Sequence, residues 1–375
     1  MRLIHTADWQ IGKVFRFVDQ ATMGVLQEAR LEAISSVGRL ALEHAAPVVL
    51  VAGDIYDVAT AEDRTLAQPL ARMRAFPTVE WHLIPGNHDP HQPGGPWDRL
   101  VHRGLPPNVR VHLEPAPASI VDGTAQLLPA PLARRRGLDD PTAWMDQVPA
   151  SGQTIRIGLA HGSISAFGSD ALTQPNLIDP SRPERAGLAY LALGDWHGVK
   201  RIGPRCWYSG TPEVDDFGVA EGGFALLVDL AAPAAPPAVE RLRTGRFDWR
   251  QETMQVHGED DIDVLGARIA ALHEDPACLL VDLRLEGTLS LAGRERLART
   301  LDDLAAALRF LRVDDRDLYL SPSAEDLEAI ARGGFVRGAA ETLRAMAEDP
   351  DEPAREIAAR ALLRLFVEHR RLSAP

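Results

Sequence analysis

The 375-residue sequence is poor in cysteine, with only Cys206 and Cys278, far apart in the chain. No cysteine pair has the short spacing of a zinc site, and two cysteines cannot build a disulfide framework. A reducing compartment fits this composition best, and we expect a cytoplasmic protein. The first residues, MRLIHTADWQ, lack the charged and apolar regions of a signal peptide. No run approaches the roughly 20 apolar residues of a membrane helix, so no membrane association is expected.

Basic residues are also in deficit. The chain has 40 Lys and Arg against 53 Asp and Glu, a formal net charge of -13. This balance excludes a basic surface over the whole molecule, the usual sign of a nucleic-acid-binding protein. Any DNA contact must therefore depend on local patches and bound metals. An acidic excess suits a metal enzyme because carboxylates bind hard cations, and it equally suits solubility alone.

Short apolar runs alternate with helical patterns through the first part of the chain. Strands are expected at residues 3–7, 47–54, 79–89, 154–162, 187–195 and 224–230, and helices at 21–46 and 62–75. Three of these strands, at 47–54, 79–89 and 187–195, run into glycine followed by Asp or Asn, and the strand at 154–162 ends in His161 and Gly162. Because α/β folds place their sites at the carboxyl ends of strands, the pattern predicts an α/β domain with its chemistry at those ends.

The later part of the chain is predicted to form additional, smaller domains. An Ala/Pro stretch at 231–238 is either a linker or a long hairpin loop. Beyond it, helices are expected near 260–273 and 291–309, and strands near 279–285 and 310–320. The tail is expected to be helical, with a last amphipathic helix that opens at Pro353. We therefore expect domains at 1–240, 241–320 and 321–375.

Five short segments carry side chains suited to metal ligation. Their polar residues are Asp8 and Gln10; Asp54 and Asp57; Asn87, His88 and Asp89; His161; and Asp195 and His197. Taken singly, each is more often a turn or structural residue than a ligand. Together, oxygen and imidazole groups recur at successive strand ends, which favours manganese, iron or zinc. A bridging carboxylate with separate ligands on each side would form a two-metal clamp for displacement at phosphorus.

The order of these segments resembles the calcineurin-like metallophosphoesterases, whose pattern is D-x-H, GDxxD, GNH[DE], H and GHxH. HTADWQIGK at 5–13 and YSGTPE at 208–213 resemble the SbcD branch, the nuclease subunits of bacterial SbcCD DNA-repair complexes. The resemblance implies a four-layer α-β-β-α core with a small α/β capping domain and a helical tail. It also implies an exo/endonuclease of DNA repair and recombination that forms a homodimer and works with an SbcC-like coiled-coil ATPase. The last helix of the tail is a candidate docking element for an ATPase partner, with packing on its own domain as the alternative.

The same resemblance implies a role for each site residue. Asp8 and His197 would bind the first metal, Asn87 and His161 the second, and Asp54 would bridge both. His88 would lie beside the scissile phosphate, to stabilise charge or protonate the leaving oxygen. Asp57 and Asp89 are interpreted as residues that orient the ligands or shape their loops.

Two positions depart from the family pattern. Gln10 replaces a histidine at the first metal, and Asp195 replaces a histidine at the second. Both keep an oxygen that can coordinate, and Asp195 adds a negative charge. The shift from nitrogen to oxygen ligands favours harder ions. We therefore expect two divalent ions, with Mn²⁺ preferred and Mg²⁺, Fe²⁺ and Zn²⁺ as alternatives.

Contacts to DNA are less clearly marked. A basic run, Arg134, Arg135 and Arg136, follows a strand that ends near the expected site, and its role is either phosphate contact or a solvated surface. Trp9 has a stacking interpretation, although a core position is favoured for it. Besides the nuclease, two other functions stay open: a phosphoesterase for small substrates, and a weakly active subunit that regulates an ATPase.

Overall fold

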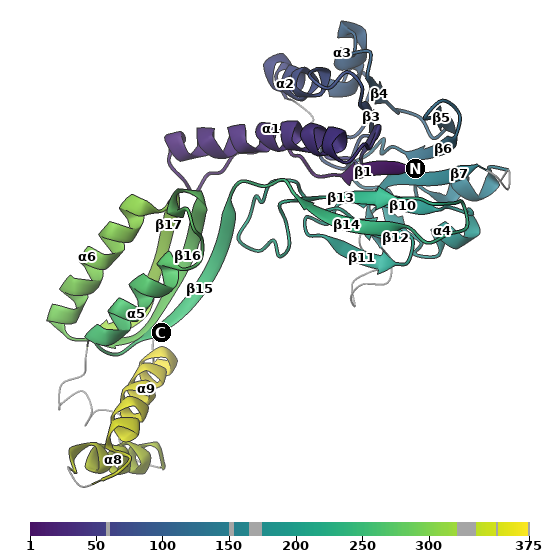
Figure 1. Ribbon diagram of the computed structural model, residues 1–375. Coiled ribbons are helices and arrows are strands. Elements are labelled where there is room, and N and C mark those ends of the chain that lie inside the picture. Colours follow the sequence, from purple (N-terminus) through teal and green to yellow (C-terminus); the bar gives the residue numbers. More distant parts are fainter. Residues whose placement is uncertain (58–60, 150–153, 165–174, 321–334, 350–351, 374–375) are drawn as a thin grey trace. The chain divides into compact units, whose positions relative to one another are not determined.

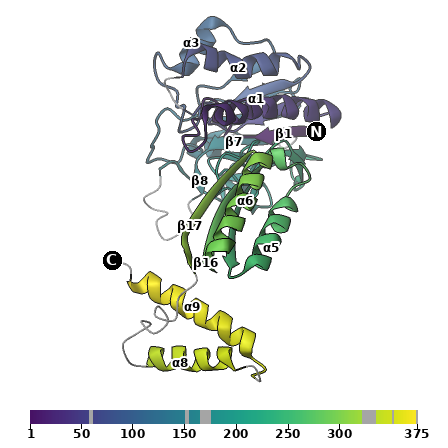
Figure 2. The same cartoon turned by 90° about the vertical axis from the view of Figure 1, so that its left-hand side faces the viewer.

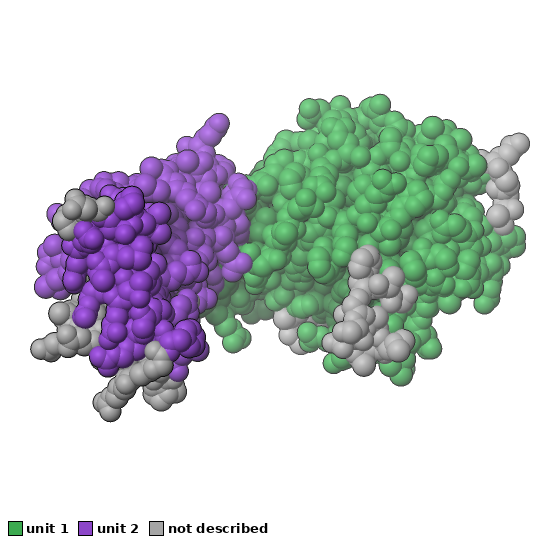
Figure 3. All heavy atoms as spheres, turned by 90° about the horizontal axis from the view of Figure 1, so that it is seen from below, with its two compact units in different colours: residues 1–247 green, residues 248–375 purple. Residues whose placement is uncertain are grey.

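The computed structural model describes residues 1–57, 61–149, 154–164, 175–320, 335–349 and 352–373 (Figure 1). These residues form two compact units, Met1–Phe247 and Asp248–Pro375, which Figure 3 colours separately. The division falls after Phe247 because the chain up to Arg243 still pairs with the first sheet. Among the described residues, no helix combines the length and apolar character needed to cross a membrane.

The first unit contains two six-stranded sheets. The first sheet has the order β14 (Ala238–Arg243), β13 (Phe224–Asp229), β1 (Arg2–Thr6), β2 (Val48–Val51), β3 (Glu80–Leu83) and β4 (Val109–Val111). β1 to β4 run parallel, and β2 is a continuous apolar run with every residue buried, as expected of a central parallel strand. β13 and β14 pair antiparallel, so the Ala/Pro stretch between them is a hairpin loop and not a linker.

The second sheet has the order β11 (Lys200–Gly203), β12 (Cys206–Tyr208), β10 (Tyr190–Gly194), β7 (Ile155–His161), β6 (Ala125–Ala130) and β5 (Ala118–Ile120). Its four central strands are parallel, and β5 and β11 pair antiparallel at the edges. A short parallel pair, β8 (Ser163–Ile164) and β9 (Leu177–Ile178), follows β7. The carboxyl ends of β7 and β10 therefore lie side by side.

Three apolar clusters show that the unit has four layers. One joins the outer face of the first sheet to α1 (Gln20–Glu43), α2 (Asp63–Arg74) and α3 (Pro96–Arg103). A second fills the space between the two sheets, with Leu50 and Leu159 among its members. A third covers the far face of the second sheet and includes Met145 from η1 (Ala143–Gln147) and Ala186, which follows α4 (Arg182–Arg185). The expected α-β-β-α core is confirmed.

Helix α1 follows the apolar pattern expected from the sequence. Its buried residues include Leu26, Ala29, Ala33, Val37 and Ala41, which recur at helical spacing. The Asp19 side chain accepts hydrogen bonds from the backbone N–H groups of Ala21 and Thr22 and so caps the helix start. The helix can then pack its apolar stripe on the first sheet.

The second unit is a three-stranded parallel sheet with helices. Its strands are β15 (Asp248–Val256), β16 (Leu279–Leu289) and β17 (Phe310–Leu320), with β16 in the centre. Helices α5 (Glu259–Ala270) and α6 (Leu291–Ala307) lie on one face of the sheet (Figure 2). The short η3 (Pro276–Cys278) leads into β16.

The chain ends in two helices, α8 (Phe335–Glu348) and α9 (Arg355–Ser373). Leu362 and Phe366 of α9 are buried, and Phe366 packs edge-on against Tyr319 of β17. The apolar side of α9 thus faces its own unit, whereas Ile357, which the helical pattern places on that side, is 72% exposed. Part of the expected helical tail, residues 321–334 and 350–351, lies outside the described residues.

Candidate metal centre

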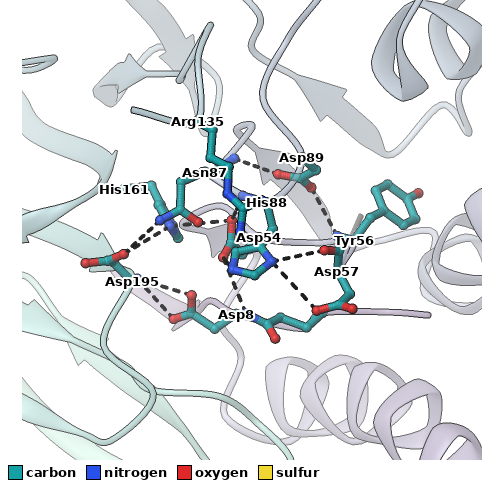
Figure 4. A network of polar contacts seen from close by, with 12 residues as sticks. Asp8, Asp54, Tyr56, Asp57, Asn87, His88, Asp89, Arg135, His161 and Asp195 are labelled. Atoms are coloured by element: carbon teal, nitrogen blue, oxygen red, sulfur yellow. Dashed lines mark hydrogen bonds and ion pairs between the residues drawn. The ribbon is translucent and has the colours of Figure 1, made fainter. Parts of the chain in front are cut away.

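The polar residues singled out in the sequence meet where strands of the two sheets end (Figure 4). Asp8 follows β1, Asp54 follows β2, and His161 is the last residue of β7. Their ligand atoms all lie within 4.8 Å of one another, and all three residues are buried. A buried group of this kind, two carboxylates and one imidazole, has the chemistry of a site for a divalent cation.

The backbone is strained at the same place. Asp8, Gln10, Asp54 and Asp195 have φ angles of 55°, 42°, 54° and 111° and are four of the nine described non-glycine residues with positive φ. Such conformations cost energy and cluster at functional sites. Gly86 is required for a related reason: a Cβ at this position would collide with the Asp54 carboxylate and backbone nitrogen. The loops are therefore shaped to bring polar side chains together.

His161 presents one ring nitrogen to the centre. Its Nδ1 donates to the Ala52 carbonyl oxygen at 2.8 Å, which leaves Nε2 directed at Asp54 Oδ1 (3.5 Å) and Asp195 Oδ1 (3.8 Å). Burial by itself lowers the pKa of His161, but the carboxylates of Asp54, Asp8 and Asp195 raise it to about 9. The surrounding charge thus favours a cation at this point.

Asn87 and Asp195 lie on the same side of the cluster. The Asn87 amide nitrogen donates to Asp195 Oδ1 at 3.1 Å, and the Ser163 hydroxyl donates to Asp195 Oδ2 at 2.6 Å. Asn87 Oδ1 and His161 Nε2 are buried and have no hydrogen-bond partner among the described residues. Buried polar atoms are rarely left unpaired. Both are ligating atoms, so the residues present fit a metal ion here.

Asp8 joins this side to the other. Both of its carboxylate oxygens accept from the backbone N–H of Asp195, at 3.1 and 3.2 Å. Burial, together with the charges of Asp54 and Asp195, raises the Asp8 pKa to about 6 against the opposing effect of two histidines. A cation beside Asp8 would relieve this cost and keep the carboxylate ionised.

Gln10 and His197 form the other side of the cluster. The Gln10 amide nitrogen lies 3.2 Å from His197 Nε2 and 3.5 Å from Asp54 Oδ2. Because an amide nitrogen donates, the His197 nitrogen that faces the centre already has a partner. Gln10 is therefore in place beside the centre, but in this arrangement its nitrogen, and not its oxygen, faces His197.

A buried ion network contacts Nδ1 of His197, the ring nitrogen that does not face Gln10. Asp215 accepts from His197 Nδ1 at 3.0 Å and pairs with Lys13 (2.8 Å) and Arg30 (3.6 Å). Burial would raise the Asp215 pKa, but Arg30, His197 and Lys13 hold it well below its usual range. In turn, Asp215 outweighs burial and raises the His197 pKa. The network fixes the orientation of His197, as outer partners do for ligating histidines.

His88 lies at the rim and not among the buried ligand atoms. Its Nδ1 donates to the Asp57 carbonyl oxygen at 3.0 Å, and its Nε2 is 4.0 Å from Asp54 Oδ2. Its side chain is 31% exposed, so solvent or substrate can reach it. Asp57 is thus the residue that orients His88, through both its carbonyl and its nearby carboxylate.

Asp89 holds two of the loops together. Its carboxylate accepts from the backbone N–H of Gly86 at 2.7 Å and of Tyr56 at 3.0 Å. Burial and the charge of Asp54 raise its pKa to about 7 despite these hydrogen bonds. Asp89 does not face the centre; its contacts are with the backbone of the loops that carry Asp54 and Asn87.

The basic run occupies a loop anchored next to the cluster. Asn176 accepts from the Gly137 N–H at 2.7 Å and donates to the Arg135 carbonyl oxygen at 3.0 Å. The Arg135 side chain extends from this loop towards the cluster in Figure 4, whereas Arg134 and Arg136 line a cavity of about 460 Å³ beside it. Trp9, in contrast, is 1% exposed and packs against Trp81, in agreement with the core interpretation.

Several residues of the centre were not identified from the sequence. Asp215, Arg30 and Ser163 each contact a site residue, yet none belongs to a segment that was selected for ligation. Lys13 lies in HTADWQIGK, and Asp215 follows YSGTPE by two residues. The signal that could have found them is this proximity to distinctive segments, because no spacing rule links position 215 to position 197.

Known proteins resemble this chain in sequence. The model of the calcineurin-like phosphoesterase family matches residues 1–230. The D subunit of the SbcCD nuclease from Rhodobacter capsulatus is 30% identical, over 63% of this chain and 68% of that protein. Among solved structures, TT1561 of Thermus thermophilus is 15% identical with a TM-score of 0.41, over 65% of this chain and 98% of the other. That score is too low to carry an argument.

Proposed function

Because this chain belongs to the calcineurin-like phosphoesterase family, we propose that it is a metal-dependent DNA phosphodiesterase that acts in DNA repair with an SMC-like ATPase partner. Similarity to a protein named as part of the SbcCD nuclease supports the choice of DNA as substrate and of an SbcC-like partner. Small phosphoesters are the competing substrate class, and a regulatory subunit is the competing role.

Two buried, unpartnered ligand atoms carry the metal part of this proposal. His161 Nε2 and Asn87 Oδ1 have no hydrogen-bond partner among the described residues. His161 Nε2 faces the carboxylates of Asp54 and Asp195, and the amide nitrogen of Asn87 donates to Asp195. An unpaired buried polar atom is costly unless an ion or solvent satisfies it. Asn87, His161 and Asp195 would hold one ion, and Asp8, Gln10 and His197 the other. Asp54 lies between the two groups and would bridge them.

The donor set favours a hard ion. Four oxygen donors (Asp8, Asp54, Asn87 and Asp195) accompany two imidazoles, and Gln10 would add a fifth if its amide turned to direct its oxygen at the centre. Carboxylate and amide oxygens suit manganese and magnesium, whereas imidazole retains affinity for manganese, iron and zinc. Mn²⁺ suits both kinds of donor, and we therefore propose it as the preferred ion.

The chemistry is hydrolysis of a phosphodiester. Bound divalent ions supply an activated water at neutral pH and neutralise charge on the attacking and leaving oxygens. The chain's own residues orient the reaction. The Asp57 carbonyl holds Nδ1–H of His88, so Nε2 is the ring nitrogen available to pass a proton to the leaving oxygen as the P–O bond breaks. Asp89 keeps the loops that carry Asp54 and Asn87 at a fixed separation.

The Arg134–Arg136 loop is proposed to hold the DNA backbone. Asn176 and Gly137 fix the loop through paired hydrogen bonds, and a fixed loop loses less entropy when it binds. Arginine contacts to phosphate position a nucleic acid without reading its sequence. This local basic patch would compensate for the acidic balance of the chain as a whole.

Cleavage of linear DNA by the purified protein with Mn²⁺ tests the function. We expect metal-dependent hydrolysis that is lost in His88→Ala, with metal binding retained because His88 lies outside the buried ligand atoms. His91→Ala is a matched control, since His91 hydrogen-bonds Asp98 away from the cluster. Metal binding without DNA cleavage, both with and without an SbcC-like ATPase, would contradict the nuclease proposal. Cleavage of a small phosphodiester alone would favour the competing substrate class.

A further inference from the structure

Trp196 stands out among the tryptophans of this chain. All seven lie within the described residues, and Trp196 is 52% exposed whereas Trp9, Trp81 and Trp97 are almost completely buried. Tryptophan carries a large apolar surface that normally packs in a core or an interface. An exposed one at a functional site therefore calls for an explanation.

The position of Trp196 is unusual as well. It lies between Asp195 and His197, in the loop that follows β10. Each of these neighbours contributes a side chain to the candidate metal centre. The backbone that carries Trp196 therefore borders the metal centre on both sides of this residue.

The loop that carries Trp196 is held at three points. The Asp195 N–H donates to Asp8, the Thr211 N–H donates to the His197 carbonyl oxygen at 2.9 Å, and the Val199 N–H donates to the Glu221 carbonyl oxygen at 3.1 Å. The exposure of Trp196 is therefore not the result of a loose loop. The ring is presented to solvent by a fixed backbone.

A cation lies next to the ring. Lys200 Nζ is 4.4 Å from the centroid of the Trp196 ring, within the range of a cation–π interaction. The residues that flank Trp196 in its loop are polar or glycine, apart from buried Val199. An exposed aromatic ring beside a cation can serve as a stacking platform for a nucleobase.

We propose that Trp196 stacks on a nucleobase adjacent to the scissile phosphate, and that the substrate is accordingly DNA with unpaired bases at the cleavage site. This inference rests on the proposed nuclease function. A base inside an intact duplex is already stacked and cannot lie on a side chain. Trp196 would therefore favour a frayed or single-stranded end over paired DNA.

Binding of two polyanions of equal charge tests this proposal. The first is a single-stranded oligothymidylate, and the second is a fully abasic strand of the same length. Binding is measured by fluorescence anisotropy with Mn²⁺, in full-length protein that carries His88→Ala to prevent cleavage. We expect the base-containing strand to bind about tenfold more tightly, the size of one stacked base. Trp196→Ala is expected to remove this preference and Trp196→Phe to keep most of it.

Controls separate stacking from structural damage. Phe335→Ala removes another exposed aromatic ring, which is 89% exposed and lies in the second unit, and should leave the preference unchanged. Because Trp196 is the most exposed tryptophan, oligothymidylate should also protect it from acrylamide quenching, and Trp196→Phe should remove that signal. A covalently closed circular duplex should show no effect of Trp196→Ala on binding.

The outcomes distinguish this proposal from the nuclease proposal. If the wild-type protein cleaves DNA but Trp196→Ala retains the full preference for bases, the stacking role is wrong and the nuclease function stands. If Trp196→Ala instead weakens association with a second protein and leaves the preference intact, Trp196 is a docking residue and the stacking role is again wrong. If the wild-type protein neither binds nor cleaves DNA with Mn²⁺, both proposals fail together.

Discussion

The two sides of the candidate metal centre are built differently. On one side, His161 Nε2 and Asn87 Oδ1 have no hydrogen-bond partner among the described residues, and the nearest groups to His161 Nε2 are the carboxylates of Asp54 and Asp195. On the other, His197 already accepts from the Gln10 amide and is held from behind by Asp215. The first side thus has donor atoms free for an ion, whereas the second is satisfied by the protein itself.

The two departures from the family pattern, Gln10 and Asp195, are therefore expected to have opposite effects on metal binding. Asp195 adds a carboxylate to the side that has free donors, and so strengthens the attraction for a cation. Gln10 adds an amide whose N–H competes with a metal ion for the lone pair of His197 Nε2. We therefore expect unequal affinities, with the ion near His161 bound more tightly than the ion near His197. Four substitutions test this expected difference in affinity.

The largest effect is expected from His161→Ala. This change removes a buried donor from the tighter side, and we expect Mn²⁺ affinity and DNA cleavage to fall by more than roughly 100-fold, since loss of an outer partner alone costs about 10- to 100-fold. Isothermal titration calorimetry and a cleavage assay measure the two effects. His82→Ala, which removes another buried imidazole that pairs with His112, is the matched control. Unchanged Mn²⁺ binding in His161→Ala would show that the ion lies elsewhere.

Asp215→Asn should lower both the affinity for the ion near His197 and the stability of the fold. Removing one charge from the buried network leaves Arg30 poorly compensated, and this should lower the free energy of unfolding by about 3–5 kcal/mol. The affinity of the weaker ion should fall about 10- to 100-fold because His197 loses its anionic partner. Urea unfolding and Mn²⁺ titration measure these effects. Asp229→Asn, which breaks an exposed pair with Arg2, should change stability by about 1 kcal/mol or less. Equal effects of the two substitutions would contradict a special role for the buried network.

Gln10→His should reduce the difference in affinity between the two bound ions. An imidazole is a stronger ligand than a neutral amide, so the affinity of the weaker ion should rise roughly tenfold. Native mass spectrometry at increasing Mn²⁺ counts the ions bound per chain. Gln10→Ala distinguishes ligation from obstruction: a lower affinity means that the Gln10 oxygen ligates, and a higher one means that its nitrogen obstructs His197. No change in either variant would remove Gln10 from the centre.

Asp195→His is expected to have the smallest effect. Both side chains can ligate, so cleavage with Mn²⁺ should stay within about threefold of the wild-type rate, while the preference shifts away from Mg²⁺ towards softer ions. Parallel cleavage assays with the two ions measure the shift. Ser163→Ala keeps the carboxylate but removes its 2.6 Å hydrogen bond, and serves as a control for orientation. If Asp195→His binds one ion fewer, the assignment of ligands to the tighter side is wrong.

The sequence predicted the elements of strong pattern and missed those of weak pattern. The strand expected at 310–320 is β17, and the helix expected at 21–46 is α1, which ends at Glu43. β15 was not recognised, because DWRQETMQV is mostly polar and several of its residues remain exposed at the sheet edge. Period-2 signals weaken where one face of a strand is open to water.

The candidate site shows the same division at the level of single residues. Asp8, Asp54, Asn87, His161 and Asp195 were selected from the sequence because each follows or ends a strand, and the fold brings them together. Asp215 could not be selected in this way, because its role depends on contacts with Lys13 and Arg30 across long stretches of chain. Trp196 was overlooked because exposure is a property of the folded surface and not of a motif.

The recurrence of polar ligands at the ends of buried parallel strands could be predicted from the sequence alone, because strand length, apolar runs and terminal glycines are local properties. Which of those ligand atoms lack a hydrogen bond depends on the tertiary structure. His161 Nε2 and His197 Nε2 belong to the same residue type at the same kind of strand end, yet the first has no hydrogen bond and the second contacts the Gln10 amide. A hydrogen bond depends on position within a few tenths of an ångström, and distances of that size are set by the packing of the two sheets.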